Sequence, residues 1–88
     1  MKEIKRMFEE LEAAEIRSNE LDEALESDPE NEELENAWNE AYEREWNASE
    51  ALINEIVKIT NGMIDNTTAR KMIAMKRNEL KNLISRIA

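Results

Sequence analysis

The feature that most constrains this chain is how little it contains that could interrupt a helix, since its 88 residues include a single glycine and a single proline. Residues of high helix propensity (Ala, Leu, Glu, Lys, Arg and Met) dominate the rest of the chain. Aromatic and β-branched residues are too thinly spread to indicate strands. The sequence therefore predicts an all-α fold, and a chain of this length forms one helical domain, residues 1–88, with a modest core.

Two breaks divide the chain into three expected helices. Asp28 and Pro29 suit the N-cap and the first position of a helix, and Asn61-Gly62 is typical of a helix C-terminus. We therefore expect helices over about residues 3–26, 29–61 and 66–87.

The spacing of the apolar residues indicates how these helices associate. The first helix has one apolar line in heptad spacing, which Ser18 interrupts, and the second has a wide apolar arc suited to contact with two neighbours. Short connections make consecutive helices antiparallel. The simplest architecture is an antiparallel three-helix bundle, and the alternative is a helical hairpin plus third helix forming a dimer.

The net charge of −9 is distributed unevenly along the chain. Residues 1–55 hold 5 Lys and Arg against 19 Asp and Glu, whereas residues 56–88 hold 7 against 2. We expect the basic third helix to lie against the two acidic helices and to neutralise part of their charge. The negative field that remains favours a protein partner with a basic surface and makes direct nucleic-acid binding unfavourable.

The second helix carries the acidic residues that form the candidate partner-binding face. They are Glu32, Glu33, Glu40, Glu43 and Glu50. Carboxylates three or four positions apart on a helix are separated by about 6 Å and repel one another, and this spacing is similar to that of phosphates along a nucleic-acid strand. Either the face occupies a basic nucleic-acid-binding groove of a partner, or it serves only to keep the protein soluble.

Aromatic residues form a second candidate surface on the same helix. Trp38, Tyr42 and Trp46 recur at every fourth position along one flank. Side chains at this spacing either belong to the core or act as anchors for a partner or for a second copy of the chain. Glu45 and Lys76 interrupt the apolar arcs of the second and third helices, and charges in such positions can fix register or oligomeric state.

The third expected helix is basic and follows a turn that contains glycine. With Arg70, Lys71, Arg77 and Lys81, it faintly resembles the recognition half of a helix-turn-helix. A small DNA-binding regulator is therefore the third function that this sequence suggests. The simpler explanation is that these bases neutralise the acidic helices.

Several kinds of chemistry have no residues to support them. The chain has no histidine and no cysteine, and its one glycine cannot form a phosphate-binding loop. We therefore expect neither an enzyme nor a bound metal or cofactor. No apolar stretch approaches the length of a membrane-spanning helix, so we expect no membrane contact and a cytoplasmic location.

Small size, strong acidity and a helical pattern without catalytic residues together resemble the accessory proteins of phages and mobile elements, in particular anti-CRISPR and anti-restriction proteins. The resemblance covers residues 1–55 best, where the acidic stretch 32–50 is similar to the surfaces of nucleic-acid mimics among them. It implies an inhibitor that occupies the basic groove of a partner such as a phage-defence nuclease. The basic residues within 70–77 depart from an all-acidic mimic. The alternative function is that of a helical oligomer with a structural or assembly role.

Overall fold

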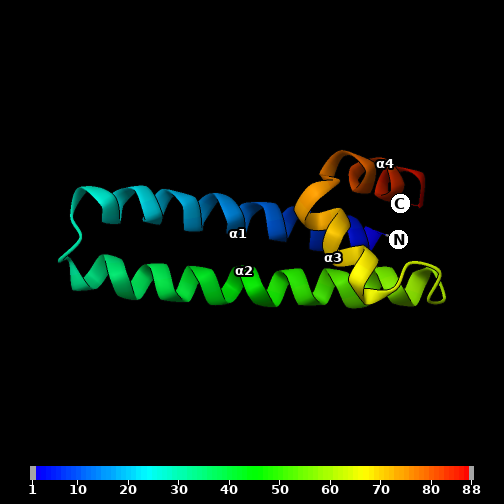
Figure 1. Ribbon diagram of the computed structural model, residues 1–88, viewed down its shortest axis with the longest axis horizontal. Helices are drawn as coiled ribbons and strands as arrows, with labels where there is room; N and C mark the ends of the chain where they lie inside the picture. Colours follow the sequence, from blue (N-terminus) through cyan, green and yellow to red (C-terminus); the bar gives the residue numbers. More distant parts are fainter. Residues whose placement is uncertain (1, 88) are drawn as a thin grey trace.

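The computed structural model describes residues 2–87, with the side chains of residues 3–86. In chain order its helices are α1 (Lys2–Ser27), α2 (Glu32–Ile59), α3 (Asn66–Met75) and α4 (Arg77–Ile87). α1 and α2 form a long antiparallel hairpin, and α3 and α4 fold back across the end that holds both termini (Figure 1). We call α3 and α4 together the step. The predicted all-α helical bundle is confirmed, although its third element differs in form from the prediction.

The connection between α1 and α2 is longer than the sequence indicated. α2 begins at Glu32 and not at Pro29, because Asn31 is its N-cap: the Asn31 side chain accepts a hydrogen bond from the Leu34 backbone N–H at 3.2 Å. Asp28, the expected cap, instead accepts a hydrogen bond from the side-chain amide of Asn31 at 3.0 Å. Both residue types are strong helix caps, so sequence alone did not choose between them.

α2 ends at Ile59 in the hydrogen-bonding pattern of a Schellman motif. The Gly62 N–H donates to the Val57 carbonyl at 2.9 Å, and the Asn61 N–H donates to the Lys58 carbonyl at 3.2 Å. Asn61 and Gly62 have φ angles of 51° and 80°, in the left-handed region that these two residue types tolerate best. Asn61-Gly62 therefore stops the helix, as the sequence predicts.

The expected single helix over residues 66–87 is wrong, because two helices meet at Lys76, whose φ and ψ of −127° and 46° are not helical. The break deprives the Ile73 carbonyl of the Arg77 backbone N–H, and the Arg77 side-chain Nε–H donates to it instead at 3.0 Å. Neither glycine nor proline marks the position. The bend is favoured by tertiary packing, since it brings Leu80 of α4 into the same core as Ile4 of α1.

The core lies at the end of the hairpin that the step covers. Its buried residues come from all four helices: Ile4, Phe8, Leu11, Leu52, Ile53, Ile56, Ala69, Leu80 and Ile84. Farther along the hairpin, where α1 and α2 have only each other, the buried residues are Ala14, Ser18, Leu21 and Ala41. The molecule is 46 Å long, and the step leaves the far part of the hairpin uncovered (Figure 1). The observed form is thus a hairpin with a third element across one end, and not three helices of full length.

Candidate protein-interaction surfaces

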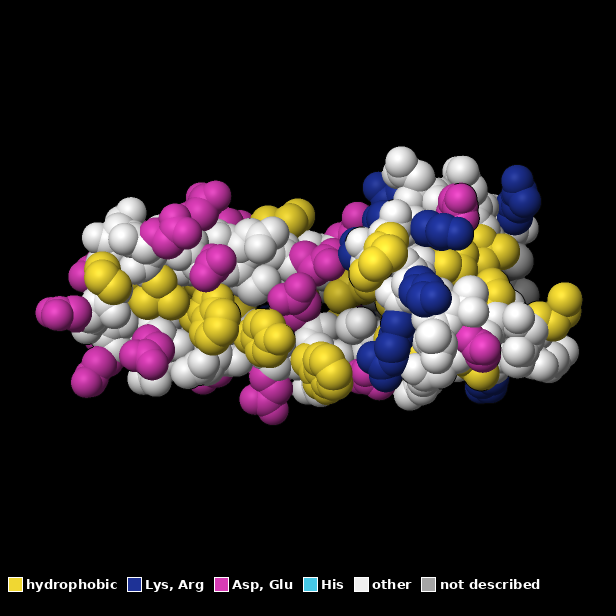
Figure 2. All heavy atoms as spheres, viewed as in Figure 1, with side chains coloured by type: hydrophobic (Ala, Val, Ile, Leu, Met, Phe, Trp, Pro, Cys, Tyr) yellow, Lys and Arg dark blue, Asp and Glu magenta, His cyan; other side chains and the backbone are white. Residues whose placement is uncertain are grey.

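The far part of the hairpin carries only negative side-chain charges. Between Arg17 of α1 and Arg44 of α2 there is no Lys or Arg, and the eleven Asp and Glu residues of this segment are all exposed. They are Glu20, Asp22, Glu23, Glu26, Asp28, Glu30, Glu32, Glu33, Glu35, Glu40 and Glu43. We call residues 18–43 the acidic tip, which is the left-hand end in Figure 2. Within residues 3–86, none of its carboxylates takes part in an ion pair.

Helical spacing distributes these carboxylates over two faces of the hairpin. We call the face that carries the step the front face. Glu15 of α1 lies on that face, since it contacts the step, and Asp22 and Glu26 follow it by seven and eleven positions and so share its side of α1. On α2, Glu35 precedes Trp38 by three positions and shares its side in the same way. The front face of the acidic tip is therefore bordered by carboxylates from both helices.

The back face has a different character. A groove of about 740 Å³ runs there between α1 and α2, with walls formed mostly by Ala13, Ala14, Ala37, Ala41, Ala48 and Ala51. Arg17, Arg44 and Glu40 also line it. The two arginines thus lie beside each other across the hairpin and mark where the acidic tip ends.

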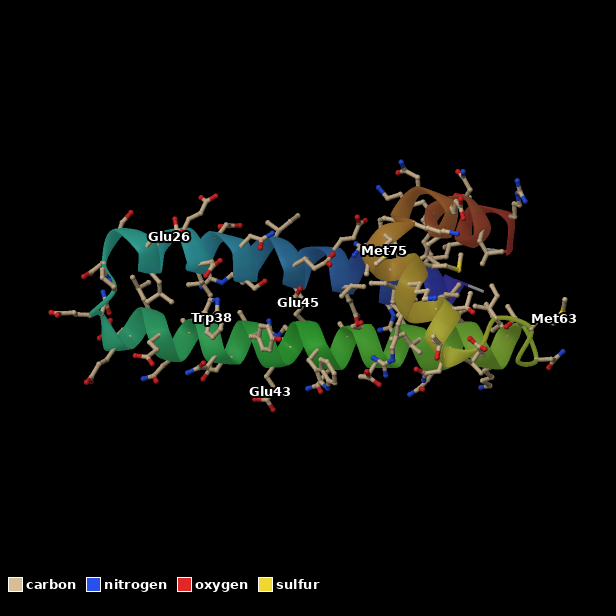
Figure 3. The ribbon with its side chains drawn as sticks, in the orientation of Figure 1. Glu26, Trp38, Glu43, Glu45, Met63 and Met75 are labelled. Carbon is tan, nitrogen blue, oxygen red and sulfur yellow. The ribbon has the colours of Figure 1, made fainter. Side chains whose placement is uncertain are left out.

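Four of the five residues predicted for the acidic face belong to the acidic tip and are exposed: Glu32, Glu33, Glu40 and Glu43. Glu43 points outward from the hairpin (Figure 3). The fifth, Glu50, lies outside the tip and forms an ion pair with α3. Its Oε1 lies 2.7 Å from Arg70 Nη1, although the angles of this contact are not those of a hydrogen bond. Sequence reasoning did not single out Asp22 and Glu26, although the lack of any base between Arg17 and Arg44 could have identified them.

Trp38, Tyr42 and Trp46 form an aromatic flank on the front face of α2. The rings of Trp38 and Tyr42 are stacked, with 5.4 Å between their centroids and 24° between their planes. Tyr42 is 54% exposed and Trp46 is 56% exposed, so neither belongs to the core. Figure 2 shows hydrophobic side chains in a line along the front of the hairpin, between acidic ones, ending at the step. Exposed Trp and Tyr in such a line are suited to binding another protein.

A small notch lies where the aromatic flank meets the step. It has a volume of about 320 Å³, and its lining includes Trp46, Glu45 and Arg77. Glu45, predicted as a register charge, accepts a hydrogen bond at 2.9 Å from Ser18, the residue that interrupts the apolar line of α1. Lys76, the other predicted register charge, is exposed at the break between α3 and α4. The structure therefore gives Glu45 a partner on α1 and does not bring it together with Lys76.

Arg77 is the main polar link between the step and the hairpin. Its Nη1 and Nη2 donate to the two carboxylate oxygens of Glu15 at 2.7 and 2.8 Å, and the guanidinium lies 5.8 Å from the centre of the Phe8 ring. The hydrogen bonds to Glu15, opposed in part by burial, raise the pKa of Arg77 above its ordinary value. A bidentate pair of this kind fixes orientation as well as distance, and it therefore sets where α4 lies on α1.

Three of the four bases considered for DNA reading pair with carboxylates of the hairpin. Arg70 contacts Glu50, Arg77 contacts Glu15, and Lys81 Nζ lies 3.8 Å from Glu12 Oε2. The fourth, Lys71, is exposed. These contacts favour the explanation that the bases of the third element neutralise the acidic helices.

Within the described part of the chain, no three acidic side chains are placed to hold a metal ion. Over the same residues, no helix combines the length and apolar character needed to cross a membrane. Comparisons with protein-family models, with curated proteins and with solved structures gave no match.

Proposed function

We propose that this chain is a protein-binding inhibitor whose acidic tip occupies a basic, nucleic-acid-binding groove of a partner such as a phage-defence nuclease. The observation that carries the proposal is the run of eleven exposed carboxylates between Arg17 and Arg44, without a single base among them. Like charges this close destabilise the hairpin that bears them. A basic partner would offset that repulsion, whereas solubility alone would be served equally well by mixed charges.

The charge density of the acidic tip supports this choice of partner. At 1.5 Å per residue the tip spans roughly 20 Å along the hairpin axis. Eleven charges over that length amount to one per about 1.8 Å, close to the spacing of roughly 1.7 Å along duplex DNA. A groove that neutralises a duplex would therefore meet a similar field here.

The arrangement of the chain also fits insertion into a groove. The acidic tip is the narrow end of the molecule, formed by two helices and their connection, while the core and the step lie at the other end (Figure 1). The pairs Arg77–Glu15 and Arg70–Glu50 place the bases of the step at that other end. The tip can thus enter a groove without carrying positive charge into it.

The proposal is tested by competition between this chain and a labelled DNA duplex for purified defence nucleases. We expect the wild-type chain to displace the duplex from its target nuclease, and Glu40→Lys with Glu43→Lys to abolish displacement, because the pair reverses charge at exposed positions of the tip. The matched control is Glu9→Lys with Glu79→Lys, which makes the same change in net charge at exposed positions outside the tip.

Two results would contradict the proposed function. One is a wild-type chain that displaces the duplex from none of a panel of restriction and CRISPR nucleases. The other is an equal loss in the control variant, which would mean that net charge and not the tip governs binding. Displacement should also weaken steeply as salt is added, because screening shortens the reach of the tip's field.

A further inference from the structure

We propose that two copies of this chain associate face to face and antiparallel, so that the step of each copy lies on the front face of the acidic tip of the other. The resulting dimer has two-fold symmetry, and the same two surfaces meet twice. This inference goes beyond the proposed function: the dimer covers the front face of the tip, so the second copy and the basic partner compete for that face.

The shape of the front face fits this arrangement. The front face has two levels, because the step covers the hairpin only at the end with the termini (Figure 1). α3 has 10 residues and α4 has 11, so each spans about 15 to 17 Å, less than half of the 46 Å length of the molecule. The step of one copy and the step of a second copy therefore fit one after the other along a single hairpin. A two-fold axis across the middle of the front face places them in this way.

Both levels of the front face expose apolar side chains. On the hairpin, Tyr42 and Trp46 are more than half exposed. They continue the row of side chains on the front face of α2 that the step covers nearer the termini. On the step, Met75 is 81% exposed, and it lies at the end of α3 nearest the uncovered hairpin (Figure 3). In the antiparallel pair, Met75 of each copy comes close to the two-fold axis, beside the aromatic flank of the other copy.

The step and the acidic tip carry opposite charges. Residues 66–87 contain six bases against the single acid Glu79, whereas the acidic tip has no base. Lys71 and Lys76 of the step are exposed, and Asp22, Glu26 and Glu35 border the front face of the tip. Opposite charges therefore meet in the antiparallel pair, whereas a parallel pair would place tip against tip. The charges decide the orientation as well as the contact.

The size of the contact is sufficient for a stable dimer. Half of a face measuring 46 by 22 Å is roughly 500 Å² in outline, so complete contact at both places, counted on both copies, would remove on the order of 2,000 Å² from solvent, and about 60% of that area still reaches the range of stable interfaces. The outer carboxylates Glu40 and Glu43 remain outside the contact. Glu40 lines the back groove, and Glu43 points outward from the hairpin (Figure 3).

The first experiment measures mass by sedimentation equilibrium over a range of concentrations. We expect the wild-type chain to approach twice its 10.3 kDa, and Trp46→Ala to raise the dimer dissociation constant by about tenfold or more, as loss of an aromatic anchor does. Ile16→Ala is the control, because Ile16 is also exposed but lies on the side of α1 away from its buried residues. A wild-type chain that stays at 10.3 kDa at every concentration overturns the proposal.

The second experiment tests the orientation by mixing two variants. Lys71→Glu with Lys76→Glu gives a step that repels the tip, and Glu26→Lys with Glu35→Lys gives a tip that repels the step. We expect each variant alone to be a monomer, and an equimolar mixture to form a heterodimer, since each of its two contacts then joins opposite charges. Circular dichroism of the separate variants checks that both are folded. Variants that still dimerise alone, or a mixture that stays monomeric, would overturn the arrangement.

Discussion

Ser18 is the only polar side chain buried among the described residues, at 6% exposure. Its hydroxyl lies 2.9 Å from Glu45 Oε2 and 3.1 Å from the Glu15 carbonyl. The single hydroxyl proton favours the charged acceptor, so Ser18 stabilises the carboxylate of Glu45 at the contact between α1 and α2. The sequence identified both residues as interruptions of apolar lines. It did not pair them, because the register of two antiparallel helices depends on the length of the turn between them.

Ser18→Ala should lower the free energy of unfolding by about 1–2 kcal/mol, because the Glu45 carboxylate loses its donor while remaining partly buried. Urea unfolding followed by circular dichroism measures the change. Ser27→Ala is the matched control, since Ser27 is exposed and its hydroxyl has only a contact of 3.5 Å within its own helix. Adding Glu45→Leu to Ser18→Ala should restore stability, because the contact is then apolar on both sides. A Ser18→Ala variant as stable as wild type would contradict the pairing.

Asp65 caps α3 and gives stability a dependence on pH. The Thr68 backbone N–H donates to Asp65 Oδ1 at 2.8 Å, and this bond lowers the pKa of Asp65 below its ordinary value of 3.8. Because the pKa is lower in the folded state, the stabilisation is present above pH 3.8 and disappears as pH falls through the folded-state value. Between pH 5 and pH 2, Asp65→Asn should therefore lose less stability than wild type, since asparagine caps without titrating.

Urea unfolding midpoints of both proteins at each pH test this expectation. The comparison isolates Asp65, because every other carboxyl is the same in the two chains. A parallel loss of stability in wild type and Asp65→Asn would contradict it.

At the scale of helices, the step is the element that sequence predicted least well. Apolar residues recur at helical spacing from Ala69 to Ile84, and a single charge such as Lys76 does not end a helix, so periodicity favours one continuous helix. The break at Lys76 depends on distant partners: Arg77 binds Glu15, 62 positions away, and also satisfies the Ile73 carbonyl that the break leaves free. The stop of α2 at Asn61-Gly62 was predicted correctly, because it is a local signal in the chain.

Arg77→Ala should therefore loosen the step more than the hairpin. The change removes the bidentate pair with Glu15 and the contact over Phe8, and hydrogen bonds between charged groups of this kind contribute about 1.5–3 kcal/mol. Hydrogen exchange should become faster in α3 and α4, with a smaller change in the middle of α1 and α2. Arg86→Ala, at an exposed base of α4, is the control. Equal acceleration along the whole chain would contradict the local role of Arg77.

For the whole molecule, composition predicted the fold class and the acidic character of residues 1–55. It did not predict where the acidic and basic residues would meet. The charges counted over residues 1–55 and 56–88 indicated that the basic C-terminal part would partly neutralise the acidic helices. The structure confines neutralisation to one end, where Glu12, Glu15 and Glu50 pair with the step, and leaves residues 18–43 without a base. The core has the same asymmetry, since the step contributes Ala69 and Leu80 only to that end. The tip is held by the contact of two helices alone.

These two ends should respond to salt in opposite directions. From about 0.01 M to about 1 M salt the screening length falls from roughly 30 Å to roughly 3 Å. Screening relieves repulsion among the eleven carboxylates of the tip and weakens the ion pairs of the step. In the monomer, at protein concentrations too low for the proposed dimer, hydrogen exchange should therefore slow in residues 18–43 and quicken in residues 66–87, after correction with unfolded peptides of the same sequence. A neutral osmolyte at matched water activity is the control, and it should slow both ends together. Salt effects of the same sign at both ends would mean that burial, and not charge, determines the local stability of the tip.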